Sequence, residues 1–383
     1  MDNKYTVGIA RCESYERGEV SAAAELAVAR AGGLPETPSE AALIKTNMLS
    51  PAPPDCAVTT HPEVLRSLSL ALINMGKSVK IADNPGYIFT NAEKLCEVTG
   101  VTAIARSIGG VEAGLLSARG ARTVRKDSFV SLKEARIWSD YLDAGYVINA
   151  AKLKTHVETE ISSCVKNIFG TADTDTRKRA HSSTSETLLA EAIVDLFTIR
   201  PPEFNVLDAI ISMEGDGPSH GKPRHTGWIL AGRNALSIDW AAATIMCYDD
   251  PLKIPLIKAA VKRNIGPRDI SEIDLVGADW SDLPSRGFKK SSSAMRILPT
   301  FIRGFAHRFV SLTPRLIEKQ CVKCGICARV CPVDAIKCDP ASYPKIDASL
   351  CVKCLCCHEM CPAGAMTAHK NFIASIASRM RGE

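Results

Sequence analysis

The sequence predicts an α/β protein whose largely parallel sheet carries helices on both faces, followed by a small cysteine-rich α+β domain. Two observations predict this class. Strand-like and helix-like segments alternate over residues 1–285 of the 383-residue chain, and paired cysteine motifs follow after residue 320. Hydrophobic residues make up 46% and charged residues 23% of the chain, which is the balance of a globular protein.

The predicted elements alternate in type along residues 1–285. Short apolar runs predict strands, and longer runs between them predict helices. The predicted strands cover residues 5–11, 40–47, 78–86, 145–152, 204–211 and 227–232, and the predicted helices cover residues 18–33, 61–76, 185–199 and 237–247. Ligands of such sheets bind beyond the carboxyl ends of the strands, so polar residues just after strands are site candidates.

Two copies of one cysteine pattern, C-x2-C-x2-C-x3-C-P, lie at 321–332 and 351–362. In this pattern three thiolates bind one iron–sulfur cube, and the fourth cysteine reaches the other cluster. We therefore predict two [4Fe-4S] clusters, one held by Cys321, Cys324, Cys327 and Cys361 and the other by Cys351, Cys354, Cys357 and Cys331. The alternative, a pair of zinc knuckles, explains neither the third cysteine of each set nor the two Cys-Pro pairs.

Residues 317–369, with a predicted hairpin between the two repeats, resemble a bacterial-type two-cluster ferredoxin domain. The resemblance implies single-electron transfer to or from a redox partner protein or another low-potential donor. Cys356 lies outside the pattern and is interpreted as a bystander thiol, although it is close enough to compete for iron. The predicted organisation is an α/β domain (1–285), a connector (286–316), the ferredoxin-like domain (317–369) and a tail (370–383).

Composition excludes several function classes. Apolar runs break before ~20 positions, so we expect no transmembrane segment. The N-terminus lacks a signal-peptide pattern, which favours a cytoplasmic protein. In that compartment the fifteen cysteines are unlikely to form a disulfide framework, and eight of them fall into the two motifs. The net charge of +5 is small and comes with no nucleic-acid-binding motif, so no nucleic-acid partner is expected.

The connector is basic, and Phe301, Phe305 and Phe309 form an apolar stripe at helical spacing. We expect this amphipathic helix to dock the ferredoxin-like domain onto the α/β domain. Contact with a membrane surface is the less favoured alternative.

Four polar segments follow predicted strands and should converge on one rim of the sheet. The candidate ligand-binding residues in them are Lys45, Asn47, Asp83, Asn84, Lys152, Lys154, Asn167, Glu214 and Asp216. If the strand continues through residue 156, then Lys152, Lys154 and His156 share one face and repel each other unless an anion lies among them. A helix carrying Lys166 would follow, and its first amides would add to an anion site. A solvated, charged sheet edge is the alternative interpretation.

At this point the residues resemble a known family. KLKTHVETEISSCVKNIFG, DAIISMEGDGPSHGKPRHTGWILAG and SIDWAAATIM are similar to the domain of unknown function 362 family over about residues 5–250. That family often carries a C-terminal two-cluster ferredoxin, as this chain does. The resemblance implies a fold and a site location, but no established activity.

The segment from His156 to Lys166 is also similar to that of nickel-pincer lactate racemases, in which the lysine holds a nucleotide-derived nickel cofactor. This resemblance implies that Lys166 anchors a cofactor and that His156 is a ligand or general base. The glycines that precede the lysine in those enzymes are replaced here by Ser163 and Cys164. The resemblance therefore points to a shared fold and site location rather than to racemisation.

The main functional hypothesis is an anaerobic iron–sulfur oxidoreductase that relays low-potential electrons between its clusters and an anionic substrate or cofactor at the rim. Lys45, Lys152, Lys154 and Lys166 would hold the anion, and His156 would donate or accept a proton. Asp83, Glu214 and Asp216 would bind polar groups or a further metal or cofactor. One alternative is an electron carrier or cluster-handling partner without a small-molecule site, and another is a racemase-like proton-transfer enzyme with structural clusters.

Overall fold

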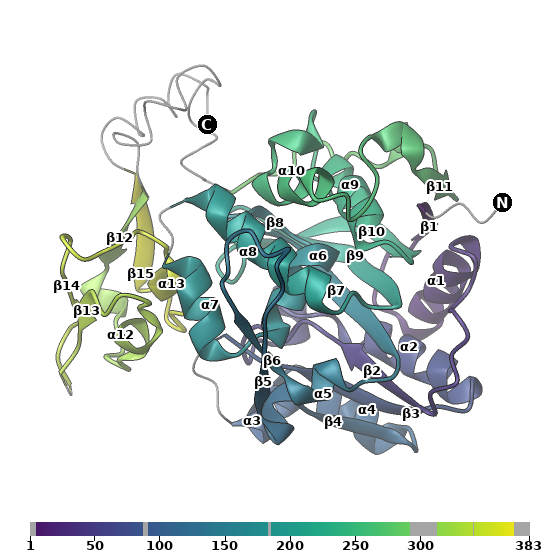
Figure 1. The fold of residues 1–383 in the computed structure, drawn as a ribbon, viewed down its shortest axis with the longest axis horizontal. Helices are drawn as coiled ribbons and strands as arrows, with labels where there is room; N and C mark the ends of the chain where they lie inside the picture. The colour runs from purple at the N-terminus through teal and green to yellow at the C-terminus, as the bar shows by residue number, and fades with distance from the viewer. Residues whose placement is uncertain (1–4, 87–90, 183–184, 292–311, 340, 371–383) are drawn as a thin grey trace.

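The computed structural model describes residues 5–86, 91–182, 185–291, 312–339 and 341–370 (Figure 1). The α/β body contains the strands β1 (Thr6–Arg11), β2 (Ala41–Lys45), β3 (Ser78–Asp83), β4 (Val111–Leu115), β5 (Ala121–Val124), β6 (Ala135–Trp138), β7 (Val147–His156), β8 (Glu160–Ser162), β9 (Phe204–Glu214), β10 (Lys222–Gly232) and β11 (Asp274–Val276). Its helices are α1 (Arg17–Arg30), α2 (Pro62–Asn74), α3 (Ala92–Val98), α4 (Val101–Ser107), α5 (Ser139–Leu142), α6 (Cys164–Asn167), α7 (Thr174–His181), α8 (Glu186–Ile199), α9 (Ala235–Ile245) and α10 (Pro255–Lys262).

Nine of the described strands form one sheet in the order β11-β1-β10-β9-β7-β2-β3-β4, with β8 paired to β7. The pairs β1–β11, β2–β3, β2–β7, β3–β4 and β7–β9 are parallel, and β1–β10, β9–β10 and β7–β8 are antiparallel. The prediction of a largely parallel sheet in an α/β fold is therefore confirmed.

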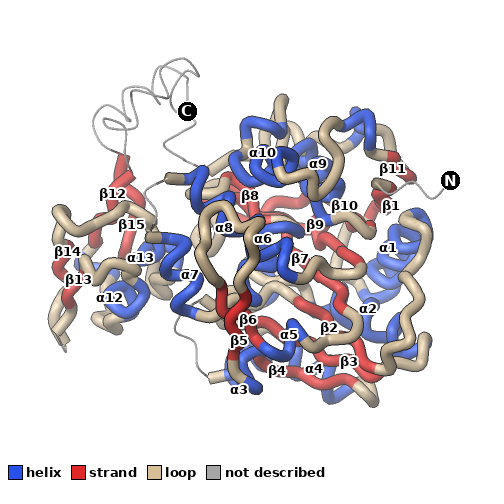
Figure 2. The backbone as a smooth tube through the Cα atoms, in the orientation of Figure 1, coloured by secondary structure: helices blue, strands red, loops and turns tan. Residues whose placement is uncertain are grey.

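Both faces of the sheet are buried under helices, shown in blue on either side of the red strands in Figure 2. Strand β7 illustrates why, because every one of its residues is buried. Val147 and Ala151 pack into the apolar cluster that includes α8, α9 and α10, whereas Ile148 and Ala150 pack into the cluster that includes α1 and α2. Alternate residues of a strand point to opposite faces, so a strand covered on both sides must be apolar throughout its central part.

The cysteine-rich segment, residues 312–339 and 341–370, is small and lies beside α7 in Figure 1. It contains the paired strands β12 (Leu312–Leu316) and β15 (Met366–Lys370), the paired strands β13 (Ile336–Lys337) and β14 (Lys345–Ile346), and the helices α12 (Ile326–Val330) and α13 (Cys356–Glu359). Its core combines apolar side chains such as Val330 and Met366 with thiols. The predicted α+β character of this region is confirmed.

The cysteine-rich segment docks on the α/β body mainly through α13 and its flanking residues. Leu355 packs with Val157 just beyond β7, and the His220 ring lies 2.9 Å from the His358 carbonyl oxygen. A Cβ atom on Gly86 would lie 2.4 Å from the Met360 sulfur, so the methionine side chain packs directly on this glycine. The stripe of Phe301, Phe305 and Phe309 that we expected to mediate docking lies outside the described residues.

The described part of the chain contains no helix with both the length and the apolar character needed to cross a membrane.

Candidate functional site

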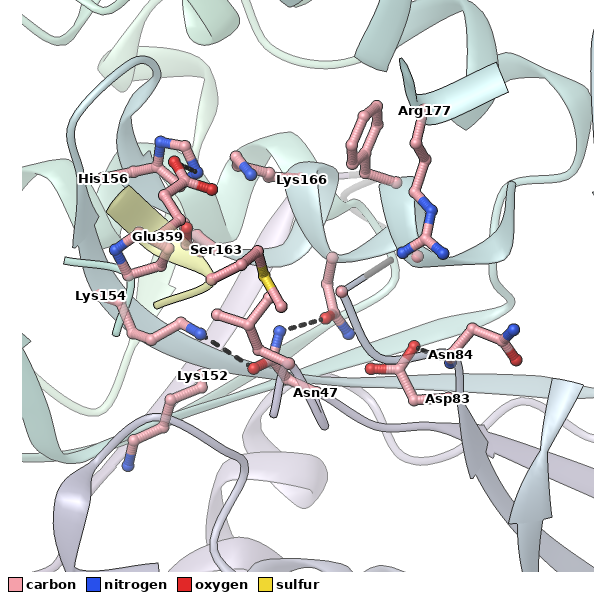
Figure 3. Close-up of a pocket in the computed structure, with 18 of the residues that line it drawn as sticks. Asn47, Asp83, Asn84, Lys152, Lys154, His156, Ser163, Lys166, Arg177 and Glu359 are labelled. Atoms are coloured by element: carbon pink, nitrogen blue, oxygen red, sulfur yellow. Dashed lines mark hydrogen bonds and ion pairs between the residues drawn. The ribbon is translucent and has the colours of Figure 1, made fainter. Parts of the chain in front are cut away.

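A cavity of about 80 Å³ lies where β2, β3 and β7 end, and we call it the rim pocket (Figure 3). The three strands are parallel neighbours, so their carboxyl ends meet at one edge of the sheet. All four predicted polar segments reach the cavity, the fourth only through Pro218. Its lining side chains include Asn47, Asp83, Asn84, Lys152, Lys154, His156, Ser163, Lys166, Asn167, Arg177, His181, Glu359 and Met360.

Strand β7 runs through residue 156, as the alternation argument required, and Lys152, Lys154 and His156 all line the rim pocket. The charge of Lys152 is nevertheless neutralised inside the protein. Its amino group lies 2.9 Å from the carboxylate of Asp208 and 2.7 Å from the hydroxyl of Tyr15, and both ionic side chains are at most 1% exposed. We expected Lys152 to hold an anionic ligand, but its anion is a residue of the neighbouring strand β9.

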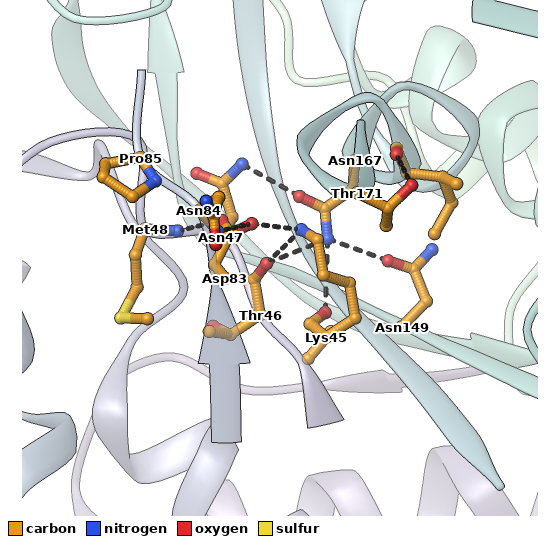
Figure 4. A network of polar contacts seen from close by, with 12 residues as sticks. Lys45, Thr46, Asn47, Met48, Asp83, Asn84, Pro85, Asn149, Asn167 and Thr171 are labelled. Carbon is orange, nitrogen blue, oxygen red and sulfur yellow. Dashed lines mark hydrogen bonds and ion pairs between the residues drawn. The ribbon is translucent and has the colours of Figure 1, made fainter. Parts of the chain in front are cut away.

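Lys45, also expected to hold the ligand, is fully buried and is not among the residues lining the cavity (Figure 4). Its ammonium lies 2.7 Å from Asp83, whose carboxylate also accepts hydrogen bonds from the amides of Met48 and Asn84. These contacts occupy the Asp83 carboxylate. The contacts of Lys45 and Asp83 therefore brace the loops after β2 and β3, and Asp83 also lines the cavity.

Asn167, another predicted ligand-binding residue, belongs to the same bracing network. Its amide nitrogen donates to Asn149 Oδ1 at 2.8 Å, and its oxygen accepts from Asn47 at 3.0 Å. Asn84 faces the cavity but also accepts a hydrogen bond from the amide of Ser117 at 3.1 Å. These contacts link α6 to β7 and to the loop after β2, and they link the loop after β3 to the segment after β4.

Lys154 and Lys166 differ from the two paired lysines. Among the described residues, neither forms an ion pair with a carboxylate, although both line the cavity. Lys154 is 1% exposed and donates to the Val58 carbonyl at 2.7 Å and to Asn47 Oδ1 at 3.0 Å. Burial, followed by the neighbouring charges of Lys166 and Lys152, lowers the pKa of Lys154 to about 7. Burial also lowers the pKa of Lys166.

His156 adopts a defined tautomer. Its Nδ1 accepts hydrogen bonds from the amides of Glu158 and Thr159, so the neutral ring carries its proton on Nε2. Nε2 lies 3.3 Å from Glu359 Oε1 and faces it. Burial, with Lys166 as the next cause, lowers the pKa of His156 well below its ordinary value, so the ring stays neutral. His156 is thus a hydrogen-bond donor to the cavity, whereas a general base would need a free lone pair.

The same tautomer bears on metal binding. Donor atoms of His156, Glu158 and Glu359 lie within 4.8 Å of one another, which is close enough for one ion. A histidine that binds a metal through one nitrogen normally donates the proton on its other nitrogen. Here the second nitrogen faces two amide donors, so His156 does not fit the role of a metal ligand.

Four charged residues of this region were missing from the prediction: Glu158, Arg177, His181 and Glu359. Glu359 lies between two cysteines of the second motif, and Arg177 and His181 lie in the basic run of α7, so both patterns offered a signal. His181 Nδ1 lies 3.0 Å from Glu158. Burial opposes protonation of His181, but the carboxylate of Glu158 outweighs it and raises the histidine pKa. Burial and Glu158 raise the pKa of Glu359 to about 8.

Two predicted ligand-binding carboxylates lie away from the cavity lining. Glu214 accepts a hydrogen bond from the Lys289 amide at 3.0 Å, and Asp216 is exposed. The segment carrying them instead supports docking through His220 and packs closely on β7, where a Cβ on Gly217 would lie 2.2 Å from the Thr155 carbonyl oxygen. Polar composition alone did not distinguish a docking loop from a binding loop.

The expected anion site at the start of the next helix is occupied from within. Helix α6 is only four residues long, and the amides of Cys164 and Val165 donate to the carboxylate of Asp239 at 2.8 and 3.2 Å. Asp239 lies on α9 and is fully buried. Asp239 therefore holds the turn that carries Lys166, and these two amides are not available to an anionic ligand.

The cysteine-rich segment contains two further cavities. The first thiol cavity is lined by Cys321, Cys324, Cys327 and Cys361, and the second thiol cavity by Cys331, Cys351, Cys354, Cys356 and Cys357. The repeats thus exchange their fourth cysteines in space. Four thiols around one cavity are the donor set of a [4Fe-4S] cluster, so these residues fit that cofactor.

The fold and these sites define an α/β protein joined to a 4Fe-4S segment with an electron-transfer role. Residues 42–244 match the family model described as Domain of unknown function (DUF362), and residues 314–337 match the 4Fe-4S binding domain. The chain belongs to the DUF362 family.

Known proteins include similar chains. Thylakoid-associated protein sll1697 of Synechocystis sp. (strain ATCC 27184 / PCC 6803 / Kazusa) is 27% identical over 318 residues, which is 80% of this chain and 96% of the relative. The lactate racemase apoprotein of Thermoanaerobacterium thermosaccharolyticum is similar in structure with a TM-score of 0.41 and 12% identity, over 64% of this chain and 58% of that one. A protein from Thermotoga maritima gives a TM-score of 0.37 and 14% identity, over 56% and 55%. The chain thus spans little more than half of either solved chain.

Proposed function

We propose that this protein is an iron–sulfur oxidoreductase whose cysteine-rich segment holds two [4Fe-4S] clusters and exchanges electrons with an anionic ligand in the rim pocket. The observation that carries the proposal is the position of α13. Cys357 lines the second thiol cavity, and Glu359 lines the rim pocket. Residues two apart have Cα atoms at most about 7 Å from each other, so one short helix forms a wall of both sites.

Each thiol cavity would hold one cluster through the cysteines already named, with Cys357 rather than Cys356 as the ligand because it keeps the repeated spacing. When bound, such a cluster supplies one-electron transfer at a potential set by its surroundings. The second cavity lies next to the rim pocket, and the first is bordered by Val322 and Cys324, which are both exposed. A redox partner would therefore exchange electrons with the cluster in the first cavity. The cluster in the second cavity would exchange electrons with the ligand.

The chain's own residues would bind the ligand, exclude water and handle protons. Lys154 and Lys166 offer charge, and docking of α13 with Met360 closes the pocket on the side of the cysteine-rich segment. His156, whose Nδ1 accepts from two amides, would offer its Nε2–H to the ligand. His181 is the better proton donor, because Glu158 favours its charged form and its ring lines the same cavity. A ligand that gains electrons can take its proton there.

The first test is the cofactor content of the protein purified without oxygen. Native mass spectrometry should give the polypeptide plus two four-iron clusters, and Cys357→Ala should retain only one. Cys247→Ala, a change far from both thiol cavities, should retain both and serves as the matched control. Zinc in place of iron, or a single cluster in the unmodified protein, contradicts this part of the proposal.

The second test asks whether electrons reach the rim pocket. Dithionite-reduced protein is mixed with a low-molecular-weight extract of anaerobically grown cells, and cluster reoxidation is followed by absorbance and electron paramagnetic resonance. Lys154→Met should slow reoxidation at least tenfold, while Lys258→Met, at an exposed position on α10, should leave it unchanged. Equal rates in the Lys154 variant and the unmodified protein would mean that electrons bypass the pocket, as in a simple carrier.

The proposal also includes the expected compartment of the protein, which is a reducing cytoplasm.

A further inference from the structure

The four lysines near the strand ends fall into two classes. Lys45 and Lys152 are paired with Asp83 and Asp208 at 2.7 and 2.9 Å, in contacts whose side chains are 0–4% exposed. Both pairs are complete without a ligand. Lys154 and Lys166 have no such partner in the part of the chain that the structure describes, and this contrast shows where the protein leaves positive charge for a ligand.

The buried position of Lys154 makes its charged form energetically unfavourable. Two of its three ammonium hydrogens are donated to Asn47 Oδ1 and the Val58 carbonyl, and among the described residues the third has no acceptor. Burying an ammonium without a counter-ion costs several kcal/mol. The lowered pKa values of both lysines have burial as their first cause, which agrees with this cost. An anion in the cavity would offset it.

Arg177 extends the positive wall. Its Nη1 donates to the Pro85 carbonyl at 2.9 Å, which fixes the guanidinium at the cavity, as Figure 3 shows. Three basic side chains, those of Lys154, Lys166 and Arg177, line the cavity. Its carboxyl groups are that of Glu359 and that of Asp83, which is already paired with Lys45. The charge of the cavity matches an acid.

The size of the cavity narrows the class of acid. The volume of about 80 Å³ exceeds the ~10–15 Å³ that one ordered water needs and is below the ~150 Å³ of an engineered cavity that binds benzene, so the site suits a small ligand. A nucleotide is several times larger. A small organic acid matches both the charge and the volume.

We propose that the rim pocket binds a small carboxylic acid, with its carboxylate among Lys154, Lys166 and Arg177. The proposal rests on the proposed function, since it names the class of ligand for the same site. Binding itself requires no electron transfer, so the two ideas can fail separately.

The experiment is calorimetric titration of the oxidised, cluster-loaded protein with acetate, butyrate, octanoate, inorganic phosphate and AMP. Butyrate should bind most tightly of the three carboxylates, and AMP should bind at least tenfold more weakly. Lys166→Met should weaken butyrate binding about 10–100-fold, the size expected for one charged hydrogen bond. Lys258→Met is the matched control and should leave the affinity unchanged.

Two further measurements keep the outcome decisive. Lys166 forms no hydrogen bond with any described residue, so Lys166→Met should melt within a few degrees of the unmodified protein; Lys154→Met repeats the test from the other wall. Tighter binding of phosphate or AMP than of butyrate overturns the choice of a small carboxylate. Equal butyrate affinity in both lysine variants and in the unmodified protein overturns the site.

Discussion

The cysteine-rich segment and the rim pocket both gather reactive side chains, but over very different distances along the chain. In the cysteine-rich segment, all the thiols of both cavities come from residues 321–361. In the rim pocket, Asn47, Lys154 and Glu359 meet from three remote parts of the chain. A motif whose members are close in sequence keeps its geometry through local turns, whereas the pocket exists only when strands, loops and the docked segment are all in place.

The same comparison extends to charge. Each thiol can serve iron whatever lies around the segment, but the role of each lysine depends on a carboxylate supplied by another element. Asp83 at the end of β3 pairs with Lys45, and Asp208 on β9 pairs with Lys152, so these two lysines stabilise the fold. Within the described part of the chain, Lys154 and Lys166 have no such carboxylate, and we expect them to be available to a ligand. Predictions can therefore be directed at each region and at the contact between them.

The largest effect is expected in the cysteine-rich segment. Cys331 belongs to the first repeat but lines the second thiol cavity, so Cys331→Ala should remove about half of the iron by disabling the second cluster. Iron and sulfide analysis of anaerobically purified protein measures this. Cys338→Ala, outside both sets, should keep all the iron. Complete iron loss in the Cys331 variant alone would mean that the two sites do not assemble separately.

A smaller but still large effect is expected when one of the buried lysines loses its paired carboxylate. Asp83→Ala leaves the Lys45 ammonium buried without its anion and should lower the free energy of unfolding by about 3–5 kcal/mol. Chemical denaturation followed by circular dichroism measures it. Glu134→Ala, which breaks the exposed pair with Arg125, should cost about 0–1 kcal/mol. Similar losses in the two variants would show that the Lys45–Asp83 pair is not the brace described here.

Lys154, which has no carboxylate partner among the described residues, should make the affinity for the ligand depend on pH. Burial is the main cause that lowers the pKa of Lys154. The neighbouring charges of Lys166 and Lys152 lower it further, those of Asp83 and Glu359 raise it, and the pKa is about 7 without ligand. Above that pH the amine must gain a proton to pair with an anion, so butyrate affinity should fall by up to about tenfold per pH unit. Calorimetry in two buffers of different ionisation enthalpy should detect proton uptake on binding, and Lys154→Met should abolish that uptake. An affinity that stays level above neutral pH in the unmodified protein would argue against Lys154 as the anion partner.

The smallest effect is expected at the contact between the two regions. His220→Ala removes a hydrogen bond to the His358 carbonyl and should cost about 0.5–1.5 kcal/mol, with faster amide exchange in α13. His225→Ala removes a similar contact, to the Glu13 carbonyl at 2.8 Å, away from the cysteine-rich segment. Hydrogen–deuterium exchange should separate the two, because only the first variant loosens α13. Unchanged exchange in α13 would mean that Leu355 and Met360 hold the segment without His220.

The sequence by itself determined the alternation of strands and helices, the exchange of cysteines between the two repeats, and the meeting of polar strand ends at one rim. These properties follow from local periodicity and spacing, which act over a few residues. The tertiary structure decided which lysines are neutralised, that Asp239 occupies the amides of α6, and that Glu359 enters the pocket. Burial and ion pairing act between groups that are distant in sequence, so the sequence pattern showed which face a side chain takes but not the partner waiting there.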